Sequence, residues 1–261
     1  MKWRRIKGML LSYFYITKNS LDRLWDIFFW PFIDILIWGF MTYFINKVTE
    51  LNVINAVLGA IMLWMFIWRG GNDFVVFLLE NYWSRNIYHL FVSPLTKLEL
   101  VVSLAALGVI RSVLSFGVLA IMSFLLYHFN ILSLNIGHAL LFIGILVLFS
   151  WAIGMLVASC IIQFGTRVQI LAWGVVWAIQ PFSCVFYPLS ALPPWAAIIA
   201  RILPTTQVFE GLRASLAGQP LNYAGLGYAF LEVLLLILVC GLLFFRAIAA
   251  AQKKGTLAKP E

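Results

Sequence analysis

Three charged residues interrupt the long apolar runs of this sequence, and their positions suggest chemistry. Asp34 lies midway along one run, Arg111 midway along another, and Glu232 about a third of the way into the last. A charge in the apolar interior of a bilayer is costly, so such residues usually serve an ion or substrate path, or pair with one another. We favour a structural pair between Arg111 and one of the two carboxylates. An ion or proton relay is the alternative.

A second charged pair lies in the stretch WRGGNDF. Arg69 and Asp73 are one helical turn apart, a spacing that allows local pairing. Gly70 and Gly71, between them, indicate a flexible or closely packed point of the chain.

Tryptophan is frequent, with 11 residues of this type. Most of them fall toward the ends of apolar runs, where membrane proteins carry aromatic belts. Trp64 and Trp68 share a helical face, as do Trp173 and Trp177. Aromatic faces of this kind can also line a path for sugars or other amphipathic molecules, and the weak candidates for that role are Trp30, Trp38, Trp64 and Trp68.

No arrangement of residues predicts catalysis. The sequence contains no GxSxG or HExxH motif, and its three cysteines occur singly, so neither a catalytic centre nor a metal site is expected. It also contains no G-x-x-x-x-G-K-[ST] loop for nucleotide phosphates, so ATP and Mg²⁺ would be bound by another chain. The weakest alternative is a membrane-embedded enzyme with Glu210 or His89 as its acid–base group.

The composition predicts an all-α polytopic membrane protein. Apolar and aromatic residues make up 63% of the chain and charged residues only 11%, whereas soluble domains contain about 25% charged residues. The formal charge of +8 does not indicate nucleic-acid binding, because the basic residues gather at the chain ends and in alternate loops.

Six apolar stretches have about the length that a helix needs to cross a bilayer. Basic residues lie mostly on the side of both termini, which places these termini in the cytoplasm. Residues 1–22 are basic and aromatic and predict an amphipathic helix on the membrane lipids, with a simple charged flank as the alternative. A single transmembrane domain at 23–246 and a cytoplasmic tail at 247–261 follow, with spans at about 24–46, 53–79, 98–127, 136–163, 168–187 and 223–246.

Two connecting segments carry further signals. Residues 80–102 predict a short cytoplasmic helix that lies on the membrane or docks on a partner, followed by a capping box of Thr96 and Glu99. Between the fifth and sixth spans, on the outer side, prolines break the chain into short pieces. We expect paired re-entrant or interfacial helices there, since broken backbone in lipid needs protein or water around it; an ordinary surface loop is the alternative.

The motifs in these two segments resemble those of ABC-2 type exporter permeases, the group that exports polysaccharides, lipids and drugs. The segments are YPLSALPPW at 187–195, LPTTQ at 203–207, EGLR at 210–213 and SPLT at 93–96. Drug-type members often carry Gly-Thr-x-Glu where this chain has residues 85–89, and polysaccharide members Phe-Pro-Arg where it has residues 92–95. Neither branch is matched, so a lipid-linked glycan, a lipid and a drug all stay open as substrates.

The resemblance implies a homodimer in a prokaryotic plasma membrane, coupled to a separate ABC ATP-binding subunit. The residues that would couple the chain to that subunit are Asn81, Tyr82, Arg85, Tyr88 and His89. The residues that would form the outer re-entrant segment are Pro188, Pro193, Pro194, Trp195, Pro204, Glu210 and Arg213. A transporter or channel that works alone through its intramembrane charges is the alternative function.

Overall fold

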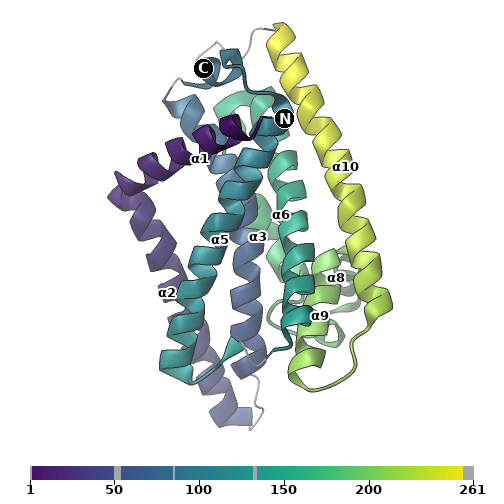
Figure 1. Ribbon diagram of the computed structural model, residues 1–261. Coiled ribbons are helices and arrows are strands. Elements are labelled where there is room, and N and C mark those ends of the chain that lie inside the picture. Colours follow the sequence, from purple (N-terminus) through teal and green to yellow (C-terminus); the bar gives the residue numbers. More distant parts are fainter. Residues whose placement is uncertain (1, 50–53, 85, 132–133, 255–261) are drawn as a thin grey trace.

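The computed structural model describes residues 2–49, 54–84, 86–131 and 134–254, and within these ranges the chain forms helices and no strand (Figure 1). The N-terminal half contains α1 (Trp3–Lys18), α2 (Leu21–Thr49), α3 (Ile54–Trp83), α4 (Ile87–Val92) and α5 (Lys97–Tyr127). The C-terminal half contains α6 (Ile136–Phe164), α7 (Leu171–Ile179), α8 (Pro194–Ile202), α9 (Pro204–Leu216) and α10 (Tyr223–Lys254), with short 3₁₀ turns at Gly165–Val168, Gln180–Phe182 and Leu189–Ala191.

Five of the described helices are long and apolar enough to cross a membrane: α2, α3, α5, α6 and α10. The fifth expected span, 168–187, is not one continuous helix, because its apolar helical part runs only from Leu171 to Phe182. At 1.5 Å per residue this piece rises about 18 Å, against a hydrocarbon thickness of about 30 Å. The helix ends near Pro181, and Cys184 then takes a left-handed backbone conformation with φ 54°. Hydropathy predicted six full-length spans. The described chain instead contains five helices of spanning length and one shorter apolar helix.

The bundle has two ends that differ in their elements (Figure 1). At one, here called the α1 end, lie α1, the end of α3 and the C-terminal part of α10. At the other, the α9 end, α9 packs against the first turns of α6 and α10. One boundary differs from expectation, since α10 continues to Lys254, into the predicted tail. Arg69 is fully buried in the middle of α3.

Helix α3 forms the centre of the bundle, with α5 and α6 packed along it. The approach is closest at Gly70, where a Cβ on Gly108 of α5 would lie 3.2 Å from the Gly70 Cα. A Cβ on Gly70 itself would overlap the side chain of Ser150 on α6. Small residues let membrane helices come this close, so the paired glycines of the WRGGNDF stretch are a packing point.

Helix α1 lies across the end of the bundle rather than along it (Figure 1). Ile6 and Tyr13 are buried, and the Tyr13 ring meets Phe77 of α3 edge-on, with ring centroids 3.7 Å apart. Burial raises the pKa of the Tyr13 hydroxyl. Trp3 and Phe14 are exposed. An amphipathic N-terminal helix is thus present, and it uses only part of its apolar surface against the rest of the chain.

The capping box predicted at the start of α5 is confirmed and also holds α1. The Thr96 hydroxyl accepts a hydrogen bond from the Glu99 amide at 3.2 Å, and the Glu99 carboxylate accepts one from the Thr96 amide at 2.9 Å. The same carboxylate accepts the Lys2 amide at 2.6 Å and an Arg5 guanidinium nitrogen at 3.3 Å. One buried carboxylate therefore connects the N-terminus of α1 to the N-terminus of α5.

Candidate functional site

Four charged side chains from three helices form a network inside the bundle. Asp73 on α3 accepts a hydrogen bond from Arg111 on α5 at 2.8 Å and lies 4.0 Å from Arg69. Asp26 on α2 accepts a second bond from Arg111 at 3.0 Å and is hydrogen-bonded to Arg69. Each carboxylate thus faces both guanidiniums, and the network joins α2, α3 and α5 through charge-assisted bonds.

This network corrects the partners expected for Arg111. Arg111 is paired, but its partners are Asp26 and Asp73 instead of Asp34 or Glu232. Asp26 lies too near the start of its helix to look like an intramembrane charge, and its distance from Arg111 in the sequence gives no hint of contact. The i,i+4 spacing of Arg69 and Asp73 was a visible signal, and the two side chains do lie together.

A cavity of about 450 Å³ lies beside this network, between α2, α3 and α7. Each helix turns one face toward it: residues 30, 34 and 38 of α2 are spaced four apart, as are 64, 68 and 72 of α3 and 173 and 177 of α7. The four tryptophans singled out from the sequence all line it, together with the Trp173–Trp177 pair. Its complete lining is Asp26, Trp30, Ile33, Asp34, Ile37, Trp38, Ile61, Trp64, Met65, Trp68, Asn72, Trp173, Trp177, Gln180 and Phe186.

The aromatic walls of the cavity are held by ring contacts between the helices. Trp38 of α2 stacks on Phe186, with centroids 3.8 Å apart and planes 15° apart. Trp68 of α3 meets Trp177 at 5.4 Å and 68°. Trp30 and Trp177 are more than half exposed, so one side of the cavity opens at the surface of the chain. The cavity is therefore a lateral, tryptophan-lined recess and not a closed core void.

Two polar groups of the recess lack partners within the described chain. The Asn72 side chain is more than nine-tenths buried, and its Oδ1 has no hydrogen-bond partner. Asp34 is half-buried, and no hydrogen bond or ion pair reaches its carboxylate. Glu232, the third charge singled out from the sequence, is half-buried on α10, away from the recess lining. The three predicted intramembrane charges are thus not brought together.

The predicted coupling segment lies at the α1 end. Asn81 is buried and donates a hydrogen bond to the Phe77 carbonyl at 2.9 Å, while its own side-chain oxygen accepts one from Asn86 at 3.4 Å. Tyr82 is half-buried against the core, and His89 is exposed. Arg85 lies outside the described residues, and so does the side chain of Tyr88. Helix α4 is anchored by the buried Ile87 and leaves Val92 exposed.

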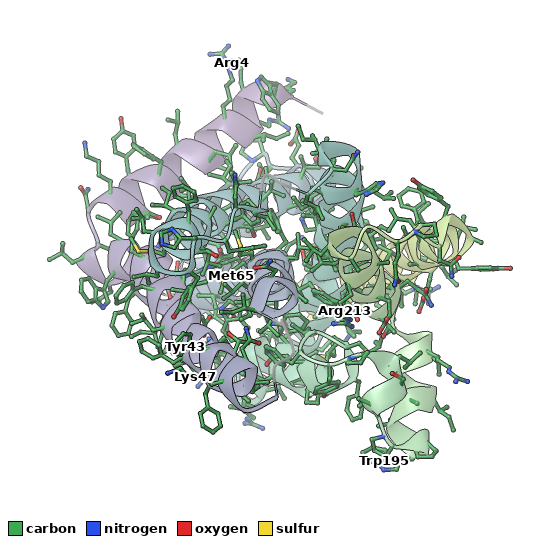
Figure 2. All side chains as sticks on the ribbon, turned by 90° about the horizontal axis from the view of Figure 1, so that it is seen from below. Arg4, Tyr43, Lys47, Met65, Trp195 and Arg213 are labelled. Carbon is green, nitrogen blue, oxygen red and sulfur yellow. The ribbon has the colours of Figure 1, made fainter. Side chains whose placement is uncertain are left out.

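The proline-rich segment forms two helices, each opened by proline. Pro193 precedes α8, Pro194 is its first residue, and Pro204 is the first residue of α9, where a missing amide hydrogen costs nothing. Trp195 is exposed on α8 and points away from the bundle (Figure 2). Both predicted helices exist; whether they re-enter a membrane stays a prediction.

A clamp from α9 replaces the backbone hydrogen bonds that are missing after α7. Arg213 donates to the carbonyl of Cys184 at 2.6 Å and to that of Val185 at 3.4 Å. Glu210 accepts the Leu189 amide, just after Pro188, at 2.8 Å and also pairs with Arg213 at 3.1 Å. Exposed carbonyl and amide groups are costly away from water, so this pair stabilises the irregular chain between the short helix and α8.

These features define a multi-pass helical membrane protein. The family model of the ABC-2 type transporter matches residues 12–217, and the chain belongs to that family. The match runs from α1 to the end of α9 and so includes the recess, α4 and the clamp. No curated protein matches the chain.

Proposed function

We propose that the chain is the permease subunit of an ATP-driven exporter and moves an amphipathic substrate out of the cytoplasm. The observation that carries the proposal is the tryptophan-lined recess, which opens laterally within a chain that belongs to the ABC-2 transporter family. Apolar recesses with a few polar groups are the usual form of small-molecule sites. Family membership supports a transport role, and the recess supplies a place for the substrate.

The distribution of charge supports an orientation with the α1 end in the cytoplasm. The α1 end carries Lys2, Arg4, Arg5 and Lys7 on or beside α1, together with Lys97 and Lys253 at the ends of α5 and α10. The α9 end carries fewer basic residues, and one of them, Arg213, is used in the clamp. Cytoplasmic ends of membrane helices carry an excess of lysine and arginine, so α4 would face a cytoplasmic partner.

We propose that α4 docks on a separate ATP-binding subunit. The 261 residues contain no phosphate-binding loop, so in this proposal the energy of ATP enters through a separate chain. Helix α4 follows directly on α3, and α3 carries both Arg69 and Asp73 and one wall of the recess. A movement of the ATP-binding subunit against α4 would therefore reach the charge network and the recess along the single helix α3. A second copy of the chain, packed against the open side, would enclose the recess.

The alternative of a transporter working alone is weaker. An ion relay needs charged groups in sequence along a path, whereas Arg111 is neutralised by Asp26 and Asp73, and Glu232 lies outside the recess. Such a transporter would move its substrate without ATP and lose activity in Glu232→Gln.

The test is affinity purification of the chain from its native host in mild detergent, followed by mass spectrometry. We expect a stoichiometric ATP-binding protein. Val92→Glu, on the exposed side of α4, should lose this partner, while the control Ile136→Glu should keep it. Ile136 is similarly exposed and is the first residue of α6 at the α9 end, where a carboxylate interacts favourably with the helix dipole. A chain that purifies alone in conditions that preserve such complexes would refute the proposal.

A further inference from the structure

We propose that the recess binds an organic cation, with Asp34 as the counter-ion and the tryptophans as its walls. This inference rests on the proposed function and adds a chemical class of substrate to it. Three features carry it: an excess of negative charge, the nature of the walls, and two polar groups that lack hydrogen-bond partners.

The charges around the recess do not balance. Asp26 and Asp34 line the recess, and Asp73 lies behind the lining, in contact with Arg69 and Arg111. Three carboxylates are therefore present, but only the two guanidiniums of Arg69 and Arg111. Both arginines form ion pairs with Asp26 and Asp73, so Asp34 has no ion pair of its own, although it feels the charge of Arg69 at longer range. An unpaired charge within a membrane helix is expensive unless a partner or water reaches it. A bound cation supplies that partner, whereas an anion would be repelled.

The walls suit a cation of large apolar surface. Six indole rings surround the space, and tryptophan is the side chain that attracts a cation most strongly over its ring face. Trp30 and Trp38 lie one helical turn before and after Asp34, so the carboxylate is placed between two indoles of the same helix. The volume of about 450 Å³ is that of a site for a drug-sized molecule.

Asn72 adds a second polar contact. Its side chain lines the recess one turn beyond Trp68, and the unpartnered Oδ1 is an acceptor without a donor. Buried acceptors are nearly always satisfied in proteins. Two acceptors, one of them charged, and no unengaged guanidinium in the recess fit a ligand that brings positive charge or hydrogen-bond donors.

The experiment measures binding of radiolabelled tetraphenylphosphonium to the chain in nanodiscs, by equilibrium dialysis against empty nanodiscs. Tetraphenylborate, of the same shape and opposite charge, is the control ligand. We expect saturable binding of the cation alone. Asp34→Asn should weaken it on the order of tenfold or more, a change that corresponds to about 1.4 kcal/mol, and Asp34→Glu should restore part of it.

Two matched variants separate the recess from general effects on the membrane. Glu232→Gln also removes a carboxylate from a long apolar helix, but outside the recess, and should bind like the wild type. Trp30→Ala should weaken binding while Trp25→Ala, on the same helix and also more than half exposed, should not. Normal elution on size exclusion shows that each variant is folded.

Three results would overturn the inference: equal binding of both ions, binding that survives Asp34→Asn, or binding of a neutral oligosaccharide such as maltoheptaose in place of the cation. The last would make the recess a sugar site with stacked indoles. The measurement needs no ATP-binding partner, so its failure leaves the permease proposal standing. Conversely, a chain that purifies alone but binds the cation would refute only the coupling.

Discussion

Removing Asp73 should destabilise the chain far more than removing a charge that water partly reaches. In Asp73→Asn, two guanidiniums are left facing the single carboxylate of Asp26. The Asp73 side chain is only 3% exposed, and that of Arg69 only 2%. Breaking a buried ion pair from one side costs about 3–5 kcal/mol, because the remaining charge is buried without compensation.

The matched comparison is the Arg23–Glu80 pair, which joins the same two helices, α2 and α3, at 2.8 Å. Its side chains are 26% and 25% exposed, against 2% and 3% for Arg69 and Asp73, so water screens this pair more and its contribution lies nearer to that of exposed pairs, about 0–1 kcal/mol. Arg23→Gln should therefore change stability little. For a chain of this size, 3–5 kcal/mol corresponds to a fall in Tm of about 6–20 °C, against at most about 4 °C for the control.

Thermal unfolding in detergent, followed with a thiol-reactive fluorophore, provides the assay. Cys184 and Cys240 are buried and free, so they become reactive when the bundle opens. The double variant Asp73→Asn/Arg111→Gln restores the balance of charge and should lose less than the sum of the single changes. If Asp73→Asn melts within 2 °C of Arg23→Gln, or if the single effects simply add, the network does not stabilise the bundle as argued.

Three further outcomes test the packing, the clamp and α1. Gly70→Ala should cost about 1–3 kcal/mol in thermal unfolding, because the added methyl overlaps a neighbouring helix, whereas Gly117→Ala, with open space around it, should be neutral or stabilising by up to about 1 kcal/mol. Arg213→Met should speed amide hydrogen exchange over residues 184–189 by at least about tenfold, whereas Arg201→Met should not. Equal exchange rates in the two variants would show that Arg213 does not stabilise this backbone. Tyr13→Phe should preserve or raise Tm, because the buried hydroxyl has no partner. Since burial raises the pKa of Tyr13, the unfolded chain loses this proton first, so wild-type stability should fall above about pH 10, and less steeply in Tyr13→Phe.

The sequence was sufficient for features that depend on local spacing or composition. The long apolar helices, the capping box of Thr96 and Glu99, the proline-opened helices and the α2 and α3 tryptophan faces all follow from periods within one segment. The partners of Arg111 could not be found in this way, because Asp26 and Arg111 are brought together only by the packing of α2 on α5.

The length of the fifth span also escaped prediction, for a different reason. Hydropathy measures how apolar a stretch is, and residues 168–187 are mostly apolar and carry no charged side chain. Whether the stretch is helical depends on Pro181, on the left-handed turn at Cys184 and on the carbonyl acceptors offered to Arg213. Hydrogen bonds between an irregular backbone and side chains of a later helix produce no repeating pattern of residue types, so the sequence does not reveal them.

The short helix α7 gives the bundle an uneven thickness. The helices α2, α3, α5, α6 and α10 are long enough to cross a full bilayer, whereas α7 with the turn that follows it, Leu171–Phe182, offers an apolar height of about 18 Å. Lipids beside α7 must shorten or tilt their chains, at a cost of fractions of a kcal/mol per Å. Acyl-chain length should therefore affect the stability of the protein, because short-chain lipids would match the short helix better than long-chain lipids.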